Sequence, residues 1–147
     1  MRAFLFIVIC LLLASCFDKG DCLLTSTTLI KVGLKDATLP ANAKSVTFTS
    51  IHIPGTGILY DDTTMSSFPI VADPRVTEIE YVFQYETRSD TLVLGYTNQT
   101  LVLSPDCGSY LYQDALEVKY STFGPDKVII RNRRLLTSVT LNFDIFL

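Results

Sequence analysis

Apolar residues alternate with polar residues along most of this chain, and this alternation constrains the fold more than any other feature. From Leu29 onward, no stretch of a dozen residues keeps the 3.6-residue apolar period of a helix. Short runs with a period of two recur instead, separated by Gly, Pro, Asn and Asp residues that favour turns. The pattern therefore predicts an all-β domain.

The spacing of these runs indicates how the strands are arranged. About nine strands, eight to twelve residues apart, are typical of a β-sandwich or a small β-barrel. We favour the antiparallel β-sandwich, because the short and broken strands between Gly55 and Pro74 suit a sheet edge. Pro69 and Pro74 support this placement, since proline cannot donate a hydrogen bond to a neighbouring strand.

Several strands are distinct enough to be placed individually. Ile30, Val32 and Leu34 share one face of a half-buried first strand. A second strand over residues 44–53 changes phase near Ser50, which predicts a β-bulge. Further strands are expected at residues 58–60, 68–71, 78–85, 92–96, 101–103, 116–120, 128–130 and 139–147, with turns at 88–90, 98–99, 105–108 and 124–126.

The N-terminus has a different character. A single charge at Arg2 is followed by an unbroken apolar run over residues 3–13 and by the small residues Ala14 and Ser15. This run is too short to cross a hydrocarbon core about 30 Å thick, which needs about 20 residues. It is typical of a signal peptide.

The residues Leu13-Ala14-Ser15-Cys16 resemble the lipobox of bacterial lipoproteins, in which the cysteine is acylated and the chain is cut before it. The resemblance implies a signal peptide over residues 1–15, a lipidated tether over 16–28 and a β-domain over 29–147. Acyl chains such as palmitate on Cys16 would hold the protein to a membrane without a transmembrane helix. The alternative is an ordinary cleaved signal, with Cys16 as a disulfide partner.

The residue after Cys16 bears on the membrane. An aspartate at that position is the inner-membrane retention signal of enterobacteria, whereas this chain has Phe17. We therefore expect a cell-envelope protein at the outer membrane, with the periplasmic and surface leaflets both open.

The remaining cysteines are expected to pair. Cys10 lies in the predicted signal peptide and Cys16 is the predicted lipid site, which leaves Cys22 and Cys107. Exported thiols tend to form disulfides, so we predict a Cys22–Cys107 bond that pins the tether to the domain. Zinc is the alternative, but two distant cysteines and the lone His52 lack the usual four ligands. No metal or other cofactor is expected.

A wider resemblance supports the same pairing. The lipobox, Cys22, the first strand and the runs over residues 90–96 and 104–108 resemble a family of small Bacteroidetes lipoproteins of uncharacterised function. The resemblance covers most of the mature chain and implies that Cys22 pairs with Cys107. It carries no activity that can be transferred.

Charge and motifs exclude several functions. The formal net charge of -3 argues against nucleic-acid binding, which needs a basic surface. His52 is the sole histidine, and the chain lacks the Gly-x-Ser-x-Gly pattern, so we do not expect an enzyme. We expect a non-catalytic structural or assembly role, in which a sheet edge or face holds an envelope protein partner.

An aromatic row motivates the alternative function. Tyr81, Phe83 and Tyr85 share one face of an expected strand. Such a row stacks against sugars or apolar ligands where it is exposed, although aromatic residues in strands usually fill a core. The alternative is thus a lipoprotein that binds a glycan or a small apolar ligand, through these residues or through a cleft between sheets.

Overall fold

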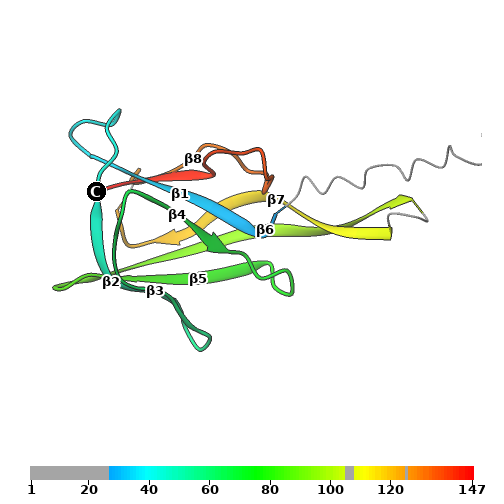
Figure 1. The fold of residues 1–147 in the computed structure, drawn as a ribbon, viewed down its shortest axis with the longest axis horizontal. Helices are drawn as coiled ribbons and strands as arrows, with labels where there is room; N and C mark the ends of the chain where they lie inside the picture. The colour runs from blue at the N-terminus through cyan, green and yellow to red at the C-terminus, as the bar shows by residue number, and fades with distance from the viewer. Residues whose placement is uncertain (1–26, 105–107, 125) are drawn as a thin grey trace, which may run out of the picture.

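The computed structural model describes residues 27–104, 108–124 and 126–147, and these residues form strands, turns and loops without a helix (Figure 1). The expected all-β class is confirmed, and the described strands number nine. They are β1 (Leu29–Lys35), β2 (Val46–Ile53), β3 (Gly57–Met65), β4 (Ser67–Val71), β5 (Glu78–Gln84), β6 (Ser89–Ser104), β7 (Gly108–Ser121), β8 (Val128–Ile130) and β9 (Phe143–Phe146).

The strands make two sheets with a shared core. One sheet has the strand order β4-β1-β9-β8, and the other has the order β3-β2-β5-β6-β7. Phe48 of the five-stranded sheet meets Phe68 of the four-stranded sheet edge to face, with ring centroids 5.9 Å apart. The described strands close no barrel, so the sandwich is confirmed over the barrel.

One pairing differs from the antiparallel arrangement that we expected. β9 lies between β1 and β8 and runs parallel to β1, with Val32 opposite Phe143 and Lys35 opposite Phe146. Every other pairing among the described strands is antiparallel. The alternation within a strand determines which face is buried but carries no information on the direction of its neighbour. The parallel pair joins the first and last of the described strands.

The strands that alternate most regularly are found as expected. Ile30, Val32 and Leu34 of β1 are buried. The register of β2 against β3 shifts between Ile51 and His52, which confirms the bulge expected near Ser50. β4, which contains Pro69, is an edge strand, also as expected.

The turn expected at residues 98–99 is wrong. β6 continues through these residues to Ser104 and pairs along most of its length with β7, making one long hairpin whose far end projects from the body (Figure 1). The Asn98 side chain does not close a turn, because its Nδ2 donates to the carbonyl oxygen of Val76 at 2.6 Å. β3 is likewise longer than the expected strand at 58–60.

The last strand is shorter than expected. We expected a strand over residues 139–147, whereas β9 covers only Phe143–Phe146 and all four of its residues are buried. Asp144 stands at a polar position of the alternation but is buried as well, and its carboxylate accepts a hydrogen bond from Arg131 Nε at 2.7 Å. Val139 and Leu141 belong to the connection that precedes β9.

Candidate functional site

A groove of about 870 Å³ lies between the β2–β3 turn and the segment that connects β4 to β5. The two walls come from residues 53–59 and 71–76, and Ile79 of β5 contributes from the core side. The apolar part of the lining includes Ile53, Pro54, Leu59, Val71, Pro74 and Val76.

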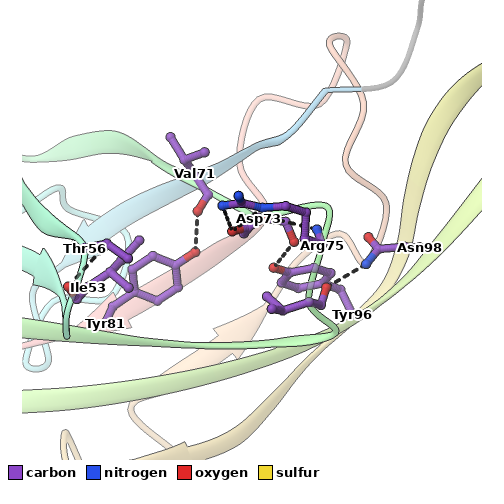
Figure 2. A network of polar contacts seen from close by, with 9 residues as sticks. Ile53, Thr56, Val71, Asp73, Arg75, Tyr81, Tyr96 and Asn98 are labelled. Carbon is purple, nitrogen blue, oxygen red and sulfur yellow. Dashed lines mark hydrogen bonds and ion pairs between the residues drawn. The ribbon is translucent and has the colours of Figure 1, made fainter.

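Buried tyrosines hold one wall of the groove in place. The Tyr81 hydroxyl donates to the carbonyl oxygen of Val71 at 2.8 Å, and the Tyr96 hydroxyl donates to that of Asp73 at 2.9 Å (Figure 2). Burial raises the pKa of both phenols, so they remain protonated donors at neutral pH. The wall is therefore fixed before any ligand arrives, which lowers the entropy cost of binding.

The exposed rim of the groove is charged. Arg75 lies against Asp73, with its Nη2 2.7 Å from Asp73 Oδ2. Hydrogen bonds from the Arg75 side chain and backbone lower the pKa of Asp73 to about 2. Glu78 and Glu80 are exposed and also line the groove. Three carboxylates and one guanidinium give the rim a net negative charge.

The polar part of the groove lining combines hydroxyls, carboxylates and one guanidinium. These groups belong to Thr28, Thr56, Asp73, Arg75, Glu78 and Glu80, and no His, Cys or Ser is among the lining residues. His52 Nδ1 lies 3.4 Å from Ser50 Oγ, outside that lining, but the Ser50 hydroxyl donates to Gln84 Oε1 at 3.0 Å. The hydroxyl proton of Ser50 therefore points to the amide oxygen of Gln84 and not to the imidazole of His52. Within the described part of the chain, no group of His, Cys, Asp and Glu residues is arranged to hold a metal ion.

The aromatic row does not form a stacking surface. Tyr81 and Phe83 are fully buried between the sheets, and Tyr85 packs its ring 5.1 Å from that of Phe48. The guanidinium of Arg88 lies over the Tyr85 ring at 4.6 Å and covers it further. Tyr81 nonetheless supports the groove, because its hydroxyl donates to the carbonyl oxygen of Val71 in the groove wall.

The other predicted site residues are not placed. Cys16, Cys22 and Cys107 all lie outside the described residues. Sequence reasoning also missed the groove itself, because its two walls are about 20 residues apart in the chain. The local signal in this region was Pro74, which we interpreted as marking a sheet edge or loop.

Comparisons with protein families, with curated proteins and with solved structures found no match to this chain. The described residues also contain no helix that is long and apolar enough to cross a membrane.

Proposed function

We propose that this protein is a non-catalytic interaction protein of a bacterial cell envelope, held to the membrane by acyl chains on Cys16. The lipobox residues 13–16 and the resemblance to small Bacteroidetes lipoproteins support the anchor and favour the outer membrane. The groove supports the interaction role, and its prearranged wall is the observation that carries the proposal.

The chemistry of the groove supports a particular kind of partner. Its apolar lining suits aliphatic or aromatic side chains, and the carboxylates of Glu78 and Glu80 suit a lysine or arginine beside them. The partner that fits both features is an envelope protein presenting an extended segment in which apolar residues flank a basic residue. Such a segment also matches the open shape of the groove.

A small apolar ligand is the second candidate for the same groove. The volume of about 870 Å³ falls within the range of small-molecule sites, and most of the lining is apolar. In that case the charged rim would contribute little to affinity, because the ligand brings no charge to meet it.

Site-specific photocrosslinking in intact cells separates these candidates. A photoreactive residue replaces Val76, which lines the groove, or Ile129, which does not line it and is equally exposed at 41%. We expect position 76 to capture a protein through a basic, apolar segment and position 129 not to capture it. The double variant E78Q/E80Q should reduce that capture.

Each other outcome has a definite meaning. Capture of a small molecule at position 76, unaffected by E78Q/E80Q, would support the second candidate. Equal capture at both positions, or none at either, would refute a role for the groove.

The anchor is tested separately by the intact mass of the membrane-fraction protein, which should lack residues 1–15 and carry acyl chains. Cys16→Ala should release the protein from the membrane or block its processing.

A further inference from the structure

The far part of the β6–β7 hairpin is a separate surface feature. Beyond Gly95, β6 pairs with β7 and with no other described strand, from Thr97 opposite Asp114 to Ser104 opposite Gly108. We call residues 97–104 and 108–114 the distal hairpin. It extends away from both sheets as a two-stranded ribbon, coloured yellow-green and yellow in Figure 1.

The distal hairpin is almost free of charge. Between Asp90 and Asp114 the sequence has a single charged residue, Asp106, although 18% of the whole chain is charged. Projecting strands usually carry charged side chains, because a neutral, open ribbon invites association with other chains. The absence of charge here is therefore a feature that needs a physical explanation.

Apolar side chains lie on both faces of the ribbon. On one face the exposed Leu101 is opposite the half-buried Tyr110, and on the other the exposed Val102 is opposite Ser109. Val102, near the tip, has 78% of its surface exposed. A flat protein partner would cover one face only. An environment that surrounds the ribbon is needed to cover both.

The root of the hairpin is held firmly. Gln113 is buried, and its Nε2 donates to Asn98 Oδ1 across the ribbon at 2.9 Å. The backbone amide of Leu135 donates to the Gln113 carbonyl oxygen at 3.2 Å, and that of Thr27 donates to the Leu135 carbonyl oxygen at 3.0 Å. The hairpin thus leaves the body close to the point where the described chain begins.

We propose that the distal hairpin enters the lipid–water interface of the membrane that carries the anchor. This inference relies on the membrane location proposed above. Residues 16–26, between the lipid site and Thr27, can extend about 36 Å, whereas the ribbon from residue 97 to 104 extends about 23 Å. Because both start near Thr27, the tether is long enough for the tip and the lipid to reach one surface.

The composition of the ribbon determines its depth and its lipid preference. Tyr110 and Tyr112 suit the headgroup level, where an aromatic ring is buried and its hydroxyl stays hydrated. An open two-stranded hairpin does not span hydrocarbon, so insertion stops at that level. Since the ribbon has no Lys or Arg, insertion needs no anionic lipid and is insensitive to salt.

The chain contains no tryptophan, so one introduced indole gives an unambiguous signal. The membrane-fraction protein carrying Val102→Trp is reconstituted in phosphatidylcholine vesicles, some containing brominated lipids. The control is Ile58→Trp on β3, where the native side chain is 63% exposed. We expect a blue shift and shallow quenching at position 102, unchanged in high salt, and neither effect at position 58.

A second substitution tests the cause. Adding Leu101→Asp to the Val102→Trp protein should reduce quenching at least tenfold. Thermal unfolding is measured alongside and should show a folded domain, because Leu101 is 39% exposed and lies outside the core cluster. Equal signals at positions 102 and 58, a signal that requires anionic lipid, or a dimer that buries position 102 without vesicles would each overturn the proposal. If the intact mass shows no acyl chains, the anchor fails, but adding the protein to vesicles still tests the hairpin.

Discussion

The carboxylate of Asp144 occupies the space above Gly33, its opposite residue in the parallel pair of β1 and β9. A Cβ atom on Gly33 would lie 2.5 Å from Asp144 Oδ1 and 3.1 Å from Leu141 Cδ1. The other carboxylate oxygen, Oδ2, is 2.7 Å from Arg131 Nε, and the Asp144 side chain is only 3% exposed. A buried acid is thus accommodated by a glycine on one side and an arginine on the other.

Gly33→Ala should destabilise the domain by about 1 to 3 kcal/mol, because the added methyl group forces a buried carboxylate to move. Gly95→Ala is the matched control in another strand. Its Cβ would lie 2.6 Å from Lys119 Cε and 3.2 Å from Lys119 Cγ, and this side chain, which is 47% exposed and paired with Glu117, can shift toward solvent. Urea unfolding should show a lower midpoint for the first variant and little change for the second. If the urea midpoints of the two variants are equal, the Asp144 carboxylate moves aside without a loss of stability.

The C-terminal strand should be essential for folding. β9 is buried along its whole length and is paired on both sides, with β1 and β8. Deleting residues 140–147 should therefore leave no folded domain, as measured by circular dichroism. Ile145→Ala should cost about 2 to 5 kcal/mol, whereas Ile129→Ala, on the edge strand β8, should cost clearly less because Ile129 is 41% exposed. A folded, stable truncation would contradict this role.

Sequence patterns predicted the strands that bury one face and missed the features that depend on distant partners. The alternation in β1 and β5 is regular because one face of each meets the core. Asn98 was mistaken for a turn residue, since its hydrogen bond to Val76 cannot be seen locally. The parallel direction of β9 and the groove between residues 53–59 and 71–76 are likewise tertiary properties, and no local period encodes them.

Alkaline pH should weaken the fold through its tyrosines. Burial raises the pKa of Tyr85 to about 12, against about 10 in an unfolded chain. The stabilising effect is therefore complete below pH 10 and is lost between pH 10 and 12, where only the unfolded state gives up its proton. Urea midpoints should fall over that window, and Tyr85→Phe should flatten the fall. If the urea midpoint falls equally steeply with pH in both proteins, the loss of stability comes from the other tyrosines.

The buried hydroxyl of Tyr96 provides a test of the groove wall. Tyr96→Phe leaves the carbonyl oxygen of Asp73 with only the longer bond from the Val76 amide, at 3.3 Å, which should cost about 1 kcal/mol and loosen residues 72–77. Tyr60→Phe removes a comparable bond to the carbonyl oxygen of Pro69, away from that segment, and is the control. Hydrogen exchange should speed up at the amide of Val76 in the first variant only. Unchanged exchange would mean that the wall is held without Tyr96.

The distances available to the chain favour the Cys22–Cys107 disulfide. Hydrogen bonds through Leu135 place Thr27 near Gln113, at the root of the distal hairpin. From there, the six residues back to Cys107 span about 20 Å, and the five residues back to Cys22 span up to about 17 Å. The two lengths are similar, so the tether is long enough to reach the level of Cys107, as the predicted disulfide requires.

Peptide mapping without reductant should consequently link the peptides that contain Cys22 and Cys107. The bond would close a loop of about 85 residues, for which the chain-entropy model gives a stabilisation of at most about 4 to 5 kcal/mol. Cys22→Ser and Cys107→Ser should lower the urea midpoint equally, and the double variant should lower it no further, since either change alone breaks the bond. Cys10→Ser is the control, because Cys10 lies in the predicted signal peptide and should leave the mature protein unchanged. If both Cys22 and Cys107 alkylate freely in the native protein, the tether is not pinned to the hairpin. An additive loss of stability in the double variant would lead to the same conclusion.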